Sequence, residues 1–352
     1  MREARHGLVM GKFYPFHSGH QALIRAALRE CDAVTVQVLG ATVETIPLDV
    51  RADWIRQEHP TARVVSAMDD APVDFDSPSA WDAHMVVIEQ LLDAPVDVVY
   101  TSDPYGEELA RRLGARWRRV DAGRADVPVS GTAIRADVAG HWHELPAPVR
   151  AWFVQRIVLV GAESTGTTTL ASALADALGT DWVPEYGRTH SAIRDGGLET
   201  PWRSDEFDLI LDRQIALEAD AARRIPSPVL VCDTDALATV LWHERYVGPA
   251  PERMWRRARA HAPRAYILTG DEIPFVQDGM RDGEHIRHDM QDRFRAVLRD
   301  QPVPWIEVRG TVEERVAQAA TFTRERMADA LAIGPSLEEL GHRVAQERKS
   351  RT

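Results

Sequence analysis

The segment Gly11-Lys12-Phe13-Tyr14-Pro15-Phe16-His17-Ser18-Gly19-His20 follows directly on the short apolar run Leu8-Val9-Met10. A strand that ends at a glycine and leads into a helix is typical of phosphate-binding turns in α/β proteins. His17 and His20 are three residues apart, so they share one face in the first helical turn. The N-terminus of that helix presents peptide N–H groups and the positive end of its dipole. The segment therefore predicts a site for a nucleoside triphosphate.

A second segment, Val129-Ser130-Gly131-Thr132-Ala133-Ile134-Arg135, supplies hydroxyl groups, a turn and a fixed cation. With the first segment it gives the patterns H-x-G-H and S-x-T-x-x-R, which resemble the signatures of the nucleotidylyltransferase superfamily. The resemblance implies that the triphosphate of ATP binds four catalytic residues, Lys12, His17, His20 and Arg135. It also implies an ATP site lined by Gly11, Phe13, Gly19, Ser130 and Thr132.

The composition is that of a globular protein of about two domains. The chain has 352 residues, of which 44% are hydrophobic and 27% charged. The net charge of −12 argues against nucleic acid as a partner. No apolar run approaches the ~20 residues of a membrane helix, and no secretory leader precedes the first strand.

Cysteine and lysine are both rare in the chain. The cysteines, Cys31 and Cys232, lie far apart in the sequence, which favours two buried thiols in a reducing cytoplasm. The only lysines are Lys12 and Lys349. We expect small molecules as partners, with a homo-oligomer left open.

The chain alternates between strands and helices. Strands are expected near 33–39, 64–67 and 96–100, with helices near 20–30, 48–58 and 79–92, which predicts a doubly wound parallel sheet. After the proline-punctuated stretch 141–148, a fresh apolar strand begins at Arg156. We expect a first α/β domain over 1–150, a second over 155–332, and a charged tail over 333–352 that is frayed or loosely docked.

The second strand leads into a further phosphate-binding pattern. Gly161-Ala162-Glu163-Ser164-Thr165-Gly166-Thr167-Thr168-Thr169 has the spacing of a P-loop, with Thr167 in the position of the usual lysine. The ATP contacts predicted here are those of Gly161, Glu163, Ser164, Thr165, Gly166, Thr167, Thr168 and Thr169. Peptide N–H groups still cradle phosphates, but the missing cation could cost ~3 kcal/mol at the transition state.

Downstream residues supply the other parts of a phosphotransfer site. The apolar run 229–232 leads into Asp233, as in a Walker-B strand, so Asp233 and Thr168 are the predicted ligands of Mg²⁺. The polar run 278–287 follows a strand and is placed like a lid. Arg281 and Arg287 on this run, or Arg188 near the preceding strand end, are candidates for the missing cation.

The order of these motifs over residues 6–330 resembles NadR-type bifunctional proteins, in which a nicotinamide mononucleotide adenylyltransferase precedes a ribosylnicotinamide kinase. The resemblance implies that ATP and nicotinamide mononucleotide give NAD and pyrophosphate, and that the second domain phosphorylates nicotinamide riboside. Some members carry an N-terminal helix-turn-helix module. We expect none here, because the first strand begins close to Leu8.

The resemblance also implies roles for individual residues. Trp81 would stack on the pyridine, with Trp54 as the alternative, and Arg51 would hold the mononucleotide phosphate. In the second domain Glu185 would act as the base, while Asp235 and Arg188 would bind the riboside.

Three other interpretations stay open. The second domain could be a degenerate kinase that binds ATP as a regulator, which Thr167 favours. The protein could be a nucleotide sensor without turnover, which Lys12, His17 and His20 argue against. The first domain could adenylylate pantetheine phosphate, flavin mononucleotide or glycerol phosphate, which the kinase-like partner domain argues against.

Overall fold

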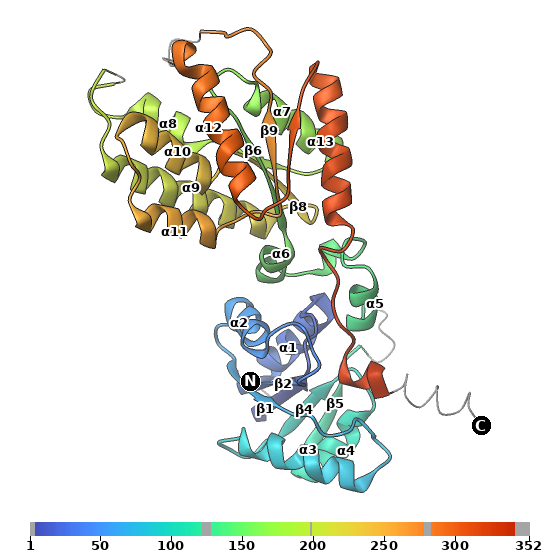
Figure 1. The fold of residues 1–352 in the computed structure, drawn as a ribbon. Helices are drawn as coiled ribbons and strands as arrows, with labels where there is room; N and C mark the ends of the chain where they lie inside the picture. The colour runs from blue at the N-terminus through green and yellow to red at the C-terminus, as the bar shows by residue number, and fades with distance from the viewer. Residues whose placement is uncertain (1–3, 122–127, 198, 278–282, 342–352) are drawn as a thin grey trace, which may run out of the picture. The chain divides into compact units, whose positions relative to one another are not determined.

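The computed structural model describes residues 4–121, 128–197, 199–277 and 283–341 (Figure 1). Contacts divide the chain into two compact units. The first contains the residues up to Val149 together with those from Ala332 on, and the second contains Arg150–Leu331. Each unit is built around one parallel five-stranded sheet, which confirms the predicted α/β class with two doubly wound domains.

The first sheet has the strand order β3-β2-β1-β4-β5. Its strands are β1 (Ala4–Gly11), β2 (Cys31–Gly40), β3 (Arg63–Met68), β4 (Val98–Thr101) and β5 (Arg116–Arg119). The connecting helices are α1 (Ser18–Glu30), α2 (Leu48–Glu58), α3 (Pro78–Gln90) and α4 (Tyr105–Leu113), followed by α5 (Gly131–Ala136), the 3₁₀ turn η1 (Trp142–Glu144) and α6 (Ala147–Phe153). The short strand β5 was not expected from the sequence.

The core of the first unit follows the period of two in its strands. Leu8, Leu39 and Val99 point to one face of the sheet, where side chains such as Trp81 and Leu109 from α3 and α4 cover them. The chain moves outward from β1 to β2 and β3 and then returns to pair β4 with the other edge of β1. This reversal opens a crevice beyond the carboxyl ends of β1 and β4, where ligands bind in such sheets.

The second sheet has the strand order β10-β9-β6-β8-β7. Its strands are β6 (Gln155–Val160), β7 (Trp182–Val183), β8 (Val229–Asp233), β9 (Ala265–Thr269) and β10 (Trp305–Val308). Its helices are α7 (Thr167–Leu178), α8 (Tyr186–Ile193), α9 (Ser204–Arg224), α10 (Ala236–Tyr246), α11 (Glu252–Ala260), the 3₁₀ turn η2 (Glu284–Ile286), α12 (Arg287–Asp300) and α13 (Val312–Met327).

The central strand β6 positions the second phosphate-binding loop. Ile157 and Leu159 on β6 pack with Leu170 and Leu174 of α7, and Ala319 of α13 joins the same cluster. Burial of this apolar face fixes the strand and the helix on either side of residues 161–166. The loop is therefore held between β6 and α7, two well-packed elements, at the carboxyl edge of the sheet.

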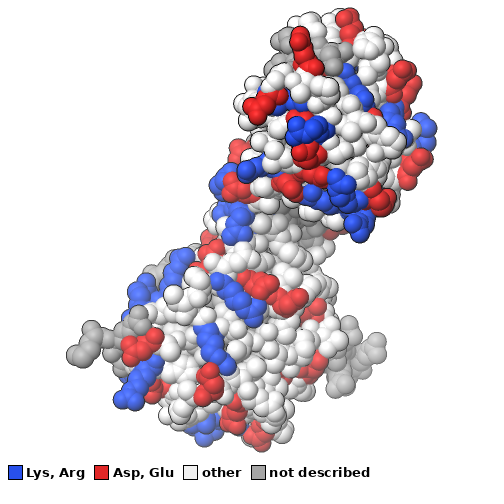
Figure 2. All heavy atoms as spheres, turned by 90° about the vertical axis from the view of Figure 1, so that its left-hand side faces the viewer, with Lys and Arg blue, Asp and Glu red and all other residues white. Residues whose placement is uncertain are grey.

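Charges of both signs intermingle on the surface. On the face drawn in Figure 2, basic and acidic side chains alternate among the described residues, without a continuous basic stripe. Within the described ranges, no helix is both long and apolar enough to cross a membrane.

Two candidate nucleotide sites

The first site is a cavity of about 740 Å³ beyond the carboxyl ends of β1 and β4. It is lined by residues of both predicted sequence segments, namely Gly11, Lys12, Phe13, His17, Gly19, His20, Ser130, Thr132 and Arg135. The fold thus brings together two segments that lie more than 100 residues apart in the sequence.

The two histidines lie together at the start of α1. His17 is the N-cap of the helix, and its Nδ1 accepts a hydrogen bond of 3.1 Å from the Gly19 N–H. The rings of His17 and His20 stack with a centroid distance of 3.8 Å. A Cβ atom on Gly19 would lie 3.0 Å from the His17 ring, so glycine lets the backbone pass close to it. The predicted shared face of the two imidazoles is present.

Lys12 belongs to a charged network at the edge of the cavity. Its Nζ lies 2.8 Å from Oε1 of Glu44, whose side chain is completely buried. Arg51 donates from the other side, to Glu44 Oε2 at 2.9 Å and to the Lys12 carbonyl at 2.8 Å. Arg51 is only 1% exposed and does not line the cavity. The prediction that Arg51 holds the mononucleotide phosphate therefore disagrees with its position, which is that of a support beneath the loop.

The serine turn places Arg135 beside the first segment. Ser130 caps α5 by accepting from the Ala133 N–H at 3.1 Å. Arg135 donates to the Tyr14 carbonyl at 2.5 Å and to Thr132 Oγ1 at 3.0 Å, and its guanidinium also pairs with Glu339. The carbonyl contact ties the two predicted segments to each other.

Aromatic side chains also line the cavity. Trp81 is among them, and its Nε1 donates to the Phe75 carbonyl at 3.1 Å. Trp54, the alternative pyridine platform, is buried in the core and does not line the cavity. Phe75 stacks on Tyr105 with a centroid distance of 5.4 Å, and both line the cavity. Sequence reasoning missed these two, because they stand in loops and at a helix start without a recognisable motif.

His84 and Asp69 form a further polar pair at this cavity that was not predicted. His84 Nδ1 lies 2.7 Å from Asp69 Oδ2, and Nε2 lies 3.1 Å from the Pro72 carbonyl. The hydrogen bond to Asp69 raises the pKa of His84. Both ring nitrogens thus face acceptors, which suits an imidazolium. No short motif links residues 69 and 84, so the sequence carried no signal for the pair.

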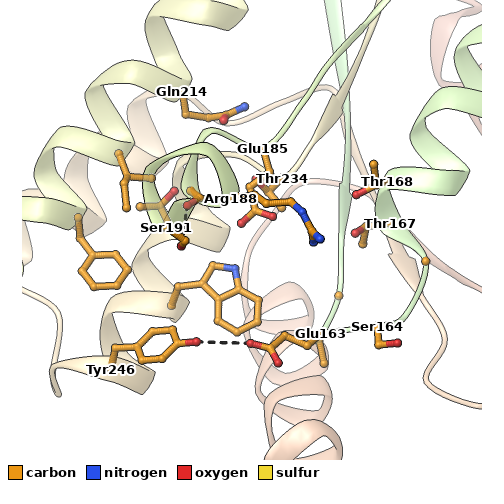
Figure 3. A pocket seen from close by; sticks show the side chains of 18 of the residues that line it. Glu163, Ser164, Thr167, Thr168, Glu185, Arg188, Ser191, Gln214, Thr234 and Tyr246 are labelled. Carbon is orange, nitrogen blue, oxygen red and sulfur yellow. Dashed lines mark hydrogen bonds between the residues drawn. The ribbon is translucent and has the colours of Figure 1, made fainter. Parts of the chain in front are cut away.

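The second site is a smaller cavity of about 170 Å³ at the loop that follows β6 (Figure 3). The loop lies against β9 so closely that a Cβ atom on Gly161 would come within 2.4 Å of Thr269 Oγ1. Gly166 has a φ of +85°, which favours glycine, and it is the N-cap of α7. The predicted loop residues line this cavity except Thr165, whose hydroxyl donates to the Ala162 carbonyl at 2.7 Å.

Asp233 and Thr168 offer oxygen donors suited to Mg²⁺. Thr168 Oγ1 donates to Asp233 Oδ2 at 2.6 Å. The other oxygen, Oδ1, is buried and accepts no hydrogen bond among the described residues. Burial raises the pKa of Asp233, against the hydroxyls of Thr168 and Thr167, which lower it. An orphaned carboxylate oxygen beside a hydroxyl fits a hard divalent cation.

Glu185 and Arg188 face the loop from the other side of the cavity. Figure 3 shows the Arg188 side chain reaching from α8 toward Thr167 and Thr168, with Glu185 behind it. Desolvation, reinforced by the Asp233 carboxylate, raises the pKa of Glu185 to about 8. In its ionised form such a carboxylate is basic enough to accept a proton from a bound hydroxyl.

Asp233, like Thr165, is not among the residues that line the cavity. Two other predicted residues of the second site lie elsewhere, and one more is outside the described residues. Asp235 is completely buried, caps α10 at the Ala238 N–H and accepts from the Tyr266 hydroxyl at 2.8 Å, so it does not face the cavity. Arg287 is buried and donates to the Ile273 carbonyl at 2.8 Å and the Ser164 carbonyl at 3.0 Å. Arg287 therefore holds the loop by its backbone and does not line the cavity, in contrast to the predicted role on a lid. Arg281 belongs to the residues 278–282, which the structure leaves out.

An aromatic wall in the second cavity was not predicted. Trp202 lies 5.1 Å from Phe207 and 5.3 Å from Tyr246 between ring centroids, and all three line the cavity. The Arg194 guanidinium stacks 3.8 Å from the centroid of Trp202. Trp202 and Phe207 lie five residues apart around the start of α9, and Tyr246 comes from the end of α10. No recognisable motif joins these two segments.

Comparisons with known proteins agree with this architecture. A family model described as an AAA domain matches residues 156–315. The "Trifunctional NAD biosynthesis/regulator protein NadR" of Escherichia coli (strain K12) is 25% identical over 348 residues, covering 92% of this chain and 83% of that protein. The "Nicotinamide-nucleotide adenylyltransferase" of Methanothrix thermoacetophila is 27% identical over 151 residues, covering 40% of this chain and 84% of that protein.

Solved structures support the same fold. The "NadR protein in complex with NR" has a TM-score of 0.67 at 20% identity, covering 91% of this chain and 96% of that one. The "NadR protein in complex with NAD and AMP-PNP" has a TM-score of 0.65 at 20% identity, covering 93% and 97%. The resemblance to NadR-type proteins that the sequence predicts is confirmed.

Proposed function

We propose that the chain makes NAD in two consecutive ATP-dependent steps. The second unit phosphorylates nicotinamide riboside, and the first joins the resulting mononucleotide to the adenylyl group of ATP. The observation that carries the proposal is the pair of phosphate-binding loops, each at the carboxyl edge of its own parallel sheet. A relative named for NAD biosynthesis is similar to this chain over 92% of its length, which supports the proposal.

Adenylyl transfer needs positioning and charge stabilisation but no covalent nucleophile. A phosphate oxygen of the mononucleotide attacks the α-phosphorus of ATP, the bond from that phosphorus to the bridging oxygen breaks, and pyrophosphate leaves. His17 and His20 at the start of α1, with Lys12 and Arg135, surround the cavity in which this charge would develop. Trp81, which lines the same cavity, is the surface against which we place the pyridine ring.

In the second unit we assign proton transfer to Glu185. The 5′-oxygen of the riboside attacks the γ-phosphorus of ATP while its proton passes to the Glu185 carboxylate, and ADP leaves. Thr168 and Asp233 would hold Mg²⁺, which neutralises phosphate charge when bound. The wall of Trp202, Phe207 and Tyr246 offers apolar faces to the nicotinamide ring, and the peptide N–H groups of the loop cradle the phosphates.

One observation favours a second candidate, a degenerate kinase unit that binds ATP without transferring phosphate. The P-loop position that usually carries lysine is Thr167, whose side chain has no charge. The raised pKa of Glu185 beside the loop favours the active enzyme, because a proton acceptor is not needed for binding ATP alone.

The decisive assay is mass spectrometry of products from the pure full chain with ATP–Mg²⁺ and nicotinamide riboside. We expect both the mononucleotide and NAD to accumulate. A parallel reaction that starts from the mononucleotide isolates the first unit. NAD from the mononucleotide but not from the riboside would establish the degenerate kinase, and no NAD from either would refute the proposed function.

A further inference from the structure

Four arginines surround the second phosphate-binding loop among the described residues. Two of them, Arg287 and Arg315, hold its outer side. Arg287 donates to the Ser164 carbonyl at 3.0 Å, and Arg315 donates to the Thr165 carbonyl at 2.7 Å. Both side chains are buried, and neither lines the cavity. Their guanidinium groups thus bind backbone carbonyl oxygens of the loop and do not face a ligand in the cavity.

The third arginine is neutralised at the cavity edge. Arg245 on α10 pairs with Glu163 at 2.6 Å, and its side chain is only 6% exposed. Glu163 also accepts from the Gly283 N–H at 2.8 Å. A pair with so little solvent contact keeps both charges engaged.

The fourth arginine, Arg188, faces the loop across the cavity. It lines the same cavity as Thr167 and Thr168, and in Figure 3 its guanidinium points across the cavity toward both threonines. Desolvation raises the pKa values of Glu185 and Asp233, and the charge of Arg188 opposes both shifts, so Arg188 lies near the proposed base and the proposed magnesium ligand.

We infer that Arg188 supplies from α8 the cation that Thr167 removes from the loop, and contacts the γ-phosphate during transfer. This assignment rests on the proposed kinase function. A guanidinium stays ionised at every relevant pH and can hold two phosphate oxygens at once. Because Arg188 follows Glu185 by three residues, the base and the cation stand on one short segment. The loop then needs to contribute only its backbone and the Thr168 hydroxyl.

The test is a double-mutant cycle in the full chain. Arg188→Ala should lower phosphoryl transfer to nicotinamide riboside by about 10²-fold, the range seen for one preorganised donor. In a Thr167→Lys background the same substitution should cost less than about fivefold, because the lysine restores the charge from the loop. Arg213→Ala, on the exposed face of α9, is the matched control and should change nothing. An equal loss in both backgrounds would overturn the inference, since it would mark Arg188 as a riboside contact only.

A binding measurement separates this inference from the proposed function. Titration of the wild type and of Arg188→Ala with Mg²⁺–AMP-PNP requires no turnover. If the wild type is inactive as a kinase but Arg188→Ala still weakens AMP-PNP at least fivefold, the phosphate contact stands and the kinase proposal fails. If the kinase is active and AMP-PNP affinity and turnover both survive Arg188→Ala, the phosphate contact is wrong.

A second inference rests on the residues 332–341, which we call the C-terminal strap. Although it follows α13 in sequence, the strap belongs to the first unit. The Gly334 N–H donates to Thr45 Oγ1 at 3.0 Å, and the Tyr14 hydroxyl donates to the Gly334 carbonyl at 3.0 Å. Ser336 is buried and caps the final turn by accepting from the Glu339 N–H at 3.3 Å. Ser336 and Glu338 line the first cavity.

The strap places a carboxylate on the proposed triphosphate residues. Glu339 pairs with Arg135 through both oxygens, at 2.5 Å from Nη2 and 3.3 Å from Nε. Burial opposes its ionisation, but the hydrogen bond from Arg135 outweighs this, supported by the Ser336 N–H and the Thr132 hydroxyl, and lowers the pKa of Glu339 to about 2. An ionised carboxylate is thus bound to Arg135 and Thr132, two side chains that we expect the triphosphate of ATP to contact.

We propose that the strap competes with the triphosphate of ATP and must release Arg135 before adenylyl transfer. Glu339 already takes hydrogen bonds from Nε and Nη2 of Arg135, and its negative charge would repel a triphosphate bound beside it. The contact therefore adds a conformational cost to ATP binding, and removal of the carboxylate lowers that cost.

The test uses the full chain with mononucleotide as acceptor, so that kinase activity is irrelevant. Glu339→Gln should lower KM for ATP about fivefold, with kcat changed less than twofold. Glu325→Gln on α13, which does not contact the first unit's cavity, is the control. A KM unchanged by Glu339→Gln would refute the competition, and a raised KM or a lost kcat would mean that Glu339 assists the reaction instead.

Discussion

Protonation of Glu185 should control phosphoryl transfer to the riboside. Its folded pKa of about 8 means that about a tenth of the carboxyl groups are ionised at pH 7, about half at pH 8 and about nine tenths at pH 9. Because the base must be ionised to take the proton, kcat/KM should rise nearly tenfold from pH 7 to pH 9 and level off above. Glu185→Gln should lose about 10²-fold or more and show no such rise.

The assay is the initial rate of mononucleotide formation at limiting riboside between pH 6 and 9.5, with ATP–Mg²⁺ saturating. Adenylyl transfer by the same samples serves as the control for loss of folding. A wild-type rate that does not change over this range, or a Glu185→Gln variant with the same pH profile, would refute the role of Glu185 as base.

The same pKa has a consequence for stability with a defined sign. An acid whose folded pKa exceeds its unfolded value of 4.5 destabilises the folded state above pH 4.5, and the effect is complete above about pH 8. The full shift would correspond to roughly 5 kcal/mol, and residual solvent contact should reduce it to about 2 kcal/mol. Glu185→Gln should therefore raise the melting temperature of the second unit at pH 8 but not at pH 4.

Three further substitutions test other parts of the two sites. His20→Ala should lower NAD synthesis from the mononucleotide by about 10²-fold with an unchanged circular dichroism spectrum, and near wild-type synthesis would refute the role of the histidine pair. Trp202→Ala should raise KM for the riboside about tenfold while Trp202→Phe raises it less than threefold, and equal effects would exclude ring stacking. Gly161→Ala should weaken AMP-PNP binding and destabilise the second unit by ~2 kcal/mol, because its Cβ would come within 2.4 Å of Thr269 Oγ1. A variant as stable as the wild type would contradict this close approach.

The sequence predicted those parts of the sites that depend on local structure. His17 and His20 share a face because a helix begins at Ser18, and the loop 161–166 joins a buried strand to a helix. Both facts follow from short patterns of glycine and apolar residues. For the same reason the expected strands and helices of the first half agree with β2, β3, β4, α1, α2 and α3 to within a few residues.

The orientation of the misassigned side chains depends on hydrogen-bond partners that no short sequence pattern reveals. Arg51 was expected at a phosphate, but the buried Glu44 carboxylate and the Lys12 carbonyl hold it beneath the cavity. Asp235 follows a strand end like a ligand, yet it turns inward to cap α10 and meet Tyr266. No residue spacing tells whether a side chain at a strand end faces the solvent edge or the core.

The contact between Lys12 and Glu44 also gives the protein an unusual chemical handle. Lys12 and Lys349 are the only lysines of the chain, so Lys12 carries the sole side-chain amine within the described residues. An amine-acylating reagent would therefore label the first cavity at one position, distinct in a peptide map from the N-terminal amine and Lys349. Lys12 forms an ion pair with Glu44, and a bound nucleotide would shield its amine from the reagent. Isotopic acyl tags read out at residue 12 by peptide mass spectrometry would thus give an occupancy footprint of one cavity in the intact chain, independent of any catalytic assay.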